Sequence, residues 1–150
     1  MVELENGQKC RAFCSSQYVR EEVQNVVNYL KKRGEGLAVK DVTPMKSGYR
    51  PEIGITPELR SEDAAYYHSF IGVLRWIVEL CRIAINVEAS MLSSHLALTR
   101  EGHFQELLHI FSYLKKHINS EMVFDPSDPD IDMDSFQHQD WSYSMYSSPG

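Results

Sequence analysis

The segment SEDAAYYHSFIGVLRWIVELCR, residues 61–82, is the most hydrophobic part of the chain and decides its fold class. Its large apolar residues recur at steps of three and four, which places them on one face of an α-helix. They are Tyr67, Phe70, Ile71, Leu74, Ile77, Val78 and Cys81. The segment GHFQELLHIFSYLKK, residues 102–116, repeats this spacing with Phe104, Leu107, Leu108, Phe111 and Leu114. Because two such faces are unstable in water, we expect the two helices to pack on each other.

The charge of the chain is divided unevenly along its 150 residues, a length that suffices for one domain with a modest core. The net charge is −6, yet no Lys or Arg follows Lys116, and seven of the 21 acidic residues lie after it. The other 14 acidic residues and all 15 Lys and Arg residues lie in residues 1–116, whose net charge is +1. The acidic total therefore does not exclude nucleic-acid contact by the body of the chain.

Composition argues against membrane, secreted and metal-binding classes. The longest apolar run, residues 70–81, is interrupted by Arg75 and Glu79 and is shorter than the ~18 residues of a membrane-spanning helix. The N-terminus shows no secretory signal pattern. Three cysteines without a CxxC pair favour reduced thiols over disulfides or a zinc site. We therefore expect an intracellular protein, in the cytoplasm or nucleus, with no membrane contact and no bound metal.

The N-terminal part of the chain predicts a β-hairpin followed by a helix. Residues 1–14 form the hairpin, because the Asn-Gly pair at residues 6–7 tolerates the positive φ of a type I′ turn. A lone two-stranded hairpin is marginal in water, so we expect it to be the edge of a larger sheet whose other strands are missing. The helix covers about residues 17–33, and Gly34 is expected to end it.

A connector and three more helices follow. Residues 35–60 are rich in Gly and Pro and predict an irregular segment that lies along the helices. Its expected apolar anchors are Leu37, Val42, Met45, Tyr49, Ile53 and Ile55. Helices are expected over residues 61–82, about 85–98 and about 99–117. The expected apolar face of the second of these carries Val87, Met91, Leu92 and His95, the last as a packed residue rather than a ligand. The expected helix caps are Ser15 or Ser16, Ser61 and Thr99.

The C-terminal part predicts one short strand, EMVF at residues 121–124, and then a flexible acidic tail. The fold class is therefore mainly α, with a small N-terminal β-hairpin, about four helices and that tail. The sequence divides into the hairpin 1–14, a helix region 15–34, the connector 35–60, a helical region 61–118 and an acidic linker 119–150.

Motifs for catalysis are missing from the sequence. It has no nucleophile elbow, no phosphate-binding loop and no dinucleotide-binding fingerprint. It also has no pair of acidic residues in the strand–turn–strand context that two-metal phosphoryl chemistry needs. We therefore assign no catalytic residue, no metal ligand and no cofactor to this chain. The cluster Lys31, Lys32 and Arg33 has two interpretations: it complements the helix macrodipole, or it contacts a nucleic-acid backbone.

Four stretches carry a family resemblance. Residues 67–77 (YHSFIGVLRWI) have the form Y-x-x-x-[IV]-G-x-L-x-[YW]-[LI], and residues 102–116 have the form H-[WF]…I-[LF]-x-Y-L-K. Residues 16–19 (SQYV) and 43–45 (TPM) precede them in the matching order. Together they resemble the Pol polyprotein of copia-type LTR retrotransposons, downstream of the polymerase active site. An R-x-D-I motif of that family stands at RIAI, where Ala84 replaces the Asp.

The resemblance implies a place within a reverse transcriptase. Residues 1–14 would be the last hairpin of the palm, 17–33 a thumb-like helix, and 61–117 the thumb and connection region leading to ribonuclease H. It further implies that the Y-x-D-D motif, which binds catalytic Mg, lies upstream and the ribonuclease H acids downstream, so this chain alone would not be an enzyme.

In the parent protein, the helices would position the RNA–DNA template–primer. The resemblance makes four residues candidates for contact with its backbone: Arg20, Lys31, Lys32 and Arg33. The alternative is a stand-alone, non-enzymatic helical module that binds a protein partner through the exposed edge of the hairpin.

Overall fold

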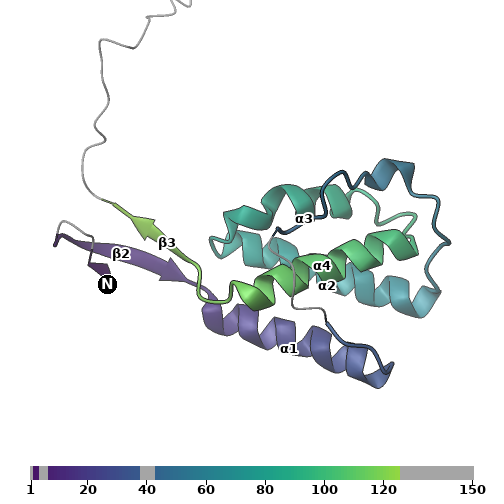
Figure 1. Ribbon diagram of the computed structural model, residues 1–150, viewed down its shortest axis with the longest axis horizontal. Helices are drawn as coiled ribbons and strands as arrows, with labels where there is room; N and C mark the ends of the chain where they lie inside the picture. The colour runs from purple at the N-terminus through teal and green to yellow at the C-terminus, as the bar shows by residue number, and fades with distance from the viewer. Residues whose placement is uncertain (1, 4–6, 38–42, 126–150) are drawn as a thin grey trace, which may run out of the picture.

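The computed structural model of the chain describes residues 2–3, 7–37 and 43–125 (Figure 1). These residues form the helices Ser16–Lys32 (α1), Ser61–Glu79 (α2), Asn86–Ser93 (α3) and Glu101–Lys116 (α4). They also form the strands Val2–Glu3 (β1), Lys9–Cys14 (β2) and Glu121–Phe124 (β3), and single 3-10 turns at Pro51–Ile53 and Ile83–Ile85. The predicted fold class is confirmed: mainly α, with a small N-terminal hairpin. The acidic tail beyond residue 125, the turn at residue 6 and the anchor Val42 lie outside the described residues.

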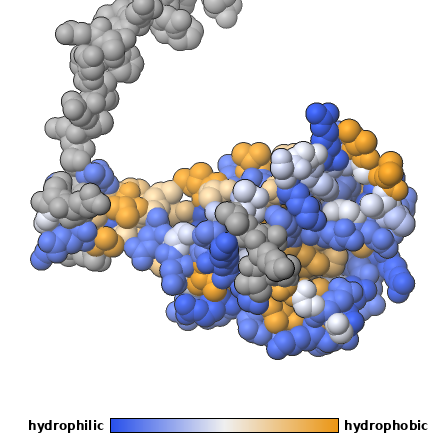
Figure 2. All heavy atoms as spheres, in the orientation of Figure 1, coloured by the Kyte–Doolittle hydropathy of each residue, from blue (hydrophilic) through white to orange (hydrophobic). Residues whose placement is uncertain are grey.

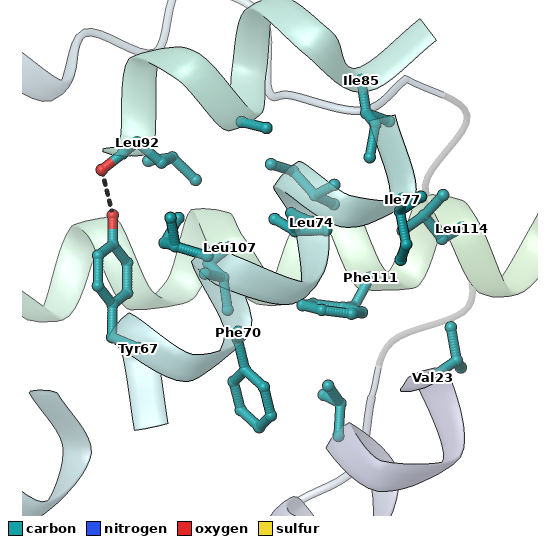
Figure 3. Close-up of a cluster of buried hydrophobic side chains, with 14 of the residues drawn as sticks. Val23, Tyr67, Phe70, Leu74, Ile77, Ile85, Leu92, Leu107, Phe111 and Leu114 are labelled. Carbon is teal, nitrogen blue, oxygen red and sulfur yellow. Dashed lines mark hydrogen bonds between the residues drawn. The ribbon is translucent and has the colours of Figure 1, made fainter. Parts of the chain in front are cut away.

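The helices pack around one hydrophobic core, shown in Figure 3. The predicted stripes of α2 and α4 face each other there. Their fully or almost fully buried members are Tyr67, Phe70, Ile71, Leu74, Ile77, Phe104, Leu107, Phe111 and Leu114. The hydroxyl of Tyr67 donates a hydrogen bond of 2.8 Å to the carbonyl oxygen of Leu92 in α3, which satisfies a polar group inside the core. No helix in the described part of the chain is both long and apolar enough to cross a membrane.

Helix α1 covers one side of this core and runs antiparallel to α4 (Figure 1). It buries Val19, Val23, Val26 and Leu30, four residues at helical spacing. It ends as predicted at Gly34, whose φ of +73° is the left-handed conformation that glycine adopts without strain. The amide of Glu35 then donates to the carbonyl oxygen of Leu30 at 3.0 Å, which closes the helix end.

Of the predicted helix caps, only Ser15 stands at an N-cap position, and none of them caps its helix through its side chain. Ser15 occupies the N-cap position of α1 but makes no capping hydrogen bond, because its hydroxyl accepts one from the Arg82 side chain instead. Ser61 is the first residue of α2, whose N-cap is Arg60. Thr99 precedes the N-cap of α4 by one residue, and its hydroxyl bonds back to the preceding turn at residues 95–96.

The connector lies along α4, as expected, but only part of its anchoring was predicted. The amide of Lys46 donates to Glu106 Oε1 at 2.7 Å. The predicted anchors Leu37, Met45 and Tyr49 pack against the core. Ile53 and Ile55 were predicted wrongly, since they are 60% and 94% exposed. Polar contacts to α4 hold that part of the connector in place of apolar ones; Gly102, for example, donates its amide to the Thr56 hydroxyl at 3.0 Å.

The second helical segment is shorter than predicted, and its buried face differs. The expected range 85–98 contains α3, which ends at Ser93. Leu92 is buried as expected, but Val87 is 66% exposed, so its placement on the apolar face is wrong. Ile85 and Ala89 occupy the core there instead.

The strands form a small sheet that projects from the helices, which we call the arm (Figure 1). Strand β2 pairs antiparallel with β1, which confirms the hairpin. It also pairs antiparallel with β3, from Arg11 opposite Phe124 to Cys14 opposite Glu121. The strand predicted at 121–124 therefore supplies a third strand that the hairpin was expected to lack.

Candidate nucleic-acid interface

Arg33, at the C-terminal end of α1, is bound by the first turn of α2. Its Nη1 and Nη2 donate to the two carboxylate oxygens of Asp63, at 2.5 and 2.9 Å. The hydroxyl of Tyr29 donates to Asp63 Oδ1 at 2.9 Å and accepts a hydrogen bond from Arg33 Nη1. We call these three residues the closed cluster.

The closed cluster fixes the charge state of its members. The hydrogen bonds from Arg33 hold the pKa of Asp63 below its ordinary value of 3.8, although burial opposes this. The bond to Asp63 likewise raises the pKa of Arg33. Burial and the bond to Asp63 raise the pKa of Tyr29 to about 12. Arg33 therefore carries a charge that is already paired with Asp63, which makes it a weaker candidate for phosphate contact than an unpaired cation.

Lys31 and Lys32 lie in the last turn of α1 and are exposed. Within the described ranges, neither forms an ion pair. Their position suits the negative end of the helix dipole, so the macrodipole interpretation suffices for them. Unlike Arg33 beside them, which is paired with Asp63, they have no acidic partner among the described residues.

Arg20 lies three turns before Lys31, near the start of α1, where it is close to two lysines of α4. It lines an open hollow of about 410 Å³ together with residues 115–120. Lys115 and Lys116 stand on its wall, because the antiparallel packing of α1 and α4 brings the start of one helix to the end of the other (Figure 1). Arg20 and Lys116 are exposed and Lys115 is half-buried. We call Arg20, Lys115 and Lys116 the open cluster.

Within residues 7–37 and 43–125, no acidic side chain lines the hollow of the open cluster. The hollow is lined by Arg20, Lys115, Lys116, His117, Ile118, Asn119 and Ser120. His117 stacks on Tyr113, with ring centroids 4.5 Å apart, and among the described residues its buried Nε2 has no hydrogen-bond partner. Three cations of two helices therefore share one concave surface whose described lining contains no carboxylate.

The structure separates the four predicted contact residues. Arg20 belongs to the open cluster, Lys31 and Lys32 lie at the far end of the same helix, and Arg33 is paired. Lys115 and Lys116 were not among the predicted contact residues. No local sequence pattern indicates this site, because Arg20 near the start of α1 and the two lysines at the end of α4 are far apart in the chain. They come together only because the two helices pack antiparallel.

Two histidines, His95 and His103, form a packed pair rather than a metal or catalytic site. The rings of His95 and His103 stack with centroids 4.6 Å apart, so His95 is a packed residue as predicted. His103 accepts from the Arg100 amide at Nδ1, and its Nε2 lies 3.2 Å from the carbonyl oxygen of Pro51. Burial lowers the pKa of His103 below 6.5. In the described part of the chain, no three His, Cys, Asp or Glu side chains are grouped to hold a metal ion.

The chain matches no protein-family model, no curated protein and no solved structure.

Proposed function

We propose that this chain positions nucleic acid through the open cluster, as part of a copia-type reverse transcriptase polyprotein. The observation that carries the proposal is that Arg20, Lys115 and Lys116 line one hollow, in whose described lining there is no acidic side chain. Cations placed this way neutralise phosphates and release their counterions, which favours binding without regard to base sequence. The four motifs that resemble the family lead to the RNA–DNA template–primer as the ligand.

The proposal gives the chain a supporting role rather than a catalytic one. We assign no reacting group and no cofactor to it, and the polymerase metals, Mg in the parent, belong to segments with the Y-x-D-D motif. Such a polyprotein acts on its template inside the cell, so we propose the cytoplasm or nucleus as its place.

The test is a salt titration of binding to a fluorescent RNA–DNA hybrid, followed by anisotropy. Each phosphate contact contributes about 0.9 to the slope of log K against log salt for a DNA duplex, and we expect a similar step for the hybrid. Arg20→Ala, Lys115→Ala and Lys116→Ala should each lower the slope by about one contact. Lys31→Ala and Lys32→Ala should have smaller effects, because they lie at the other end of α1.

The matched control is Arg75→Ala, which removes one exposed cation from α2 and leaves both clusters intact. It should lower affinity slightly through net charge, and leave the slope unchanged. Equal slopes for Arg20→Ala and Arg75→Ala, or no binding by the full chain at low salt, would refute the proposal.

A second candidate function is protein binding through the arm. Phe13, Val123 and Phe124 are 49%, 41% and 53% exposed, and none of them belongs to the helical core. Figure 2 shows hydrophobic residues among polar ones on the arm. Exposed apolar strands of this kind recruit a further strand from a partner.

Sedimentation and binding of a hydrophobic dye separate the two candidates. A module that works through the arm should self-associate or bind the dye, and Phe13→Ser with Phe124→Ser should abolish this. A monodisperse protein without dye binding would speak against the second candidate and leave the first untouched.

A further inference from the structure

Arg82 is a buried cation that bonds to neutral groups. It follows α2 and is 6% exposed. Its Nε donates to the Ser15 hydroxyl at 3.3 Å, its Nη1 to the carbonyl oxygen of His117 at 2.8 Å, and its Nη2 to the carbonyl oxygen of Ile118. Within residues 7–37 and 43–125 it forms no ion pair with a carboxylate. Burial lowers its pKa, yet a guanidinium stays charged in proteins.

The three acceptors lie at two junctions that are distant in sequence. Ser15 separates β2 from α1, and His117 and Ile118 separate α4 from β3. One side chain therefore joins the point where the chain leaves the arm to the point where it returns (Figure 1). The carbonyl oxygens at the end of α4 carry the partial negative charge of the helix dipole, which compensates the buried guanidinium.

The same two junctions carry the open cluster. Arg20 lies in α1 five residues after Ser15, and Lys116 directly precedes His117. Because α1 begins and α4 ends at these junctions, a bond that holds Ser15 near His117 also helps to hold Arg20 near Lys115 and Lys116. We infer that Arg82 is a positioning residue, which holds the two sides of the hollow at the spacing that nucleic-acid binding uses. This inference rests on the proposed function for its ligand, and on Arg82 itself for its geometry.

Arginine is needed for this role because its planar fork offers donors in three directions. A lysine keeps the charge, but its three N–H donors are on one nitrogen, so it cannot reproduce the three separate nitrogen positions from which Arg82 donates. Arg82→Lys therefore separates the geometry of Arg82 from its charge. Arg82→Met removes both and retains much of the apolar stem.

Amide hydrogen exchange tests the geometry without nucleic acid. The amide of Val19 bonds to the Ser15 carbonyl oxygen and the amide of His117 to that of Tyr113, both at 3.0 Å, so they report on the two junctions. In Arg82→Lys these two amides should exchange at least tenfold faster, while the Ala64 amide at the closed cluster is unchanged. Asp63→Asn, the matched control, should show the reverse pattern. Unchanged exchange, or an equal increase at both ends, would overturn the inference.

Binding to the RNA–DNA hybrid then tests the coupling. In the full chain, Arg20→Ala should lower the salt slope by about 0.9. In the Arg82→Lys background, the same change should lower it by less than half as much, because Arg20 no longer faces the phosphates together with the lysines. Equal effects in both backgrounds would mean that Arg82 does not position the cluster. If the unaltered chain does not bind, the proposed function fails, and the exchange pattern alone decides whether Arg82 sets the geometry.

Discussion

The two ends of α1 carry the same kinds of side chain in opposite states. At its C-terminal end, Arg33 is bound by Asp63 and Tyr29. At its N-terminal end, Arg20 shares a hollow with Lys115 and Lys116, and among the described residues no acid lines that hollow. The charge of Arg33 in the closed cluster joins α1 to α2, whereas no acid among the described residues pairs with the cations of the open cluster. A basic residue is thus a candidate contact when no acidic side chain near it in space already pairs with its charge.

The largest expected effect on stability is at the closed cluster. Asp63→Asn should lower the free energy of unfolding by about 2 kcal/mol, less than the 3–5 kcal/mol of a fully buried pair, because the Arg33 side chain is 33% exposed. Urea denaturation measures this, with Glu62→Gln, an exposed neighbour in α2, as the control. If Asp63→Asn and Glu62→Gln lost similar free energies of unfolding, the ion pair of Asp63 with Arg33 would not stabilise the fold, and the two clusters would not differ. Since the substitution frees Arg33, it should also raise the affinity for the RNA–DNA hybrid.

Protonation of Asp63 in acid should lower the free energy of unfolding by about as much as Asp63→Asn does, because both remove the carboxylate charge. The pKa of Asp63 is lowered in the folded chain, so the unfolded chain binds more protons as the pH falls below about 3.8. Its stabilising contribution is fully present above that pH and is lost as the pH falls through the lower, folded value. The stability difference between the unaltered chain and Asp63→Asn should therefore be constant from pH 5 to 7 and shrink toward pH 2. A difference that persists at pH 2 would assign the loss to something other than the ion pair.

A smaller effect is expected from the hydroxyl of Tyr29. Tyr29→Phe removes the bond to Asp63 and keeps the ring, which packs on Phe70 with centroids 5.7 Å apart. The loss should be about 1 kcal/mol, since Arg33 still pairs with the carboxylate. Measured in the Asp63→Asn background, the same substitution should cost less than half of that. Additive losses would show that the three residues do not act as one cluster.

The smallest effect is expected at the open cluster. Arg20→Gln should change the free energy of unfolding by no more than about 0.5 kcal/mol, and any change should be stabilising, because it removes repulsion from Lys115 and Lys116. Thermal and urea unfolding check this beside the Arg75→Gln control. A clear loss of stability would mean that Arg20 has a structural partner and that the contrast between the two ends is false.

Features set by local spacing could be predicted from the sequence. The stripe from Tyr67 to Ile77, the glycine at the end of α1 and the strand at 121–124 depend on residues that are near each other in the chain. The errors arose where a distant group competes. Ser15 does not cap α1 because Arg82, from the end of α2, takes its hydroxyl. Ile55 is exposed because polar bonds between the connector and α4 hold that segment in place of apolar contacts.

The candidate site was predicted in part for the same reason. Arg20 was named from its charge, but its neighbours Lys115 and Lys116 come to it only through the packing of α1 on α4. Arg33 was named from its place in a basic run, and the acid that pairs with it lies 30 residues on, in α2. A list of basic residues carries no information about such pairing.

The pairing of β2 with β3 has a consequence for the order of folding. These strands flank residues 15–120, so the whole helical body is the loop of one hairpin. Closing a disordered loop of that length costs roughly 4 kcal/mol of chain entropy, far more than four residue pairs outside the core return. The strands can therefore join only after the helices have shortened the gap between their ends. The β2–β3 register should form last and open first, so protection of its amides implies that the helical body is already folded.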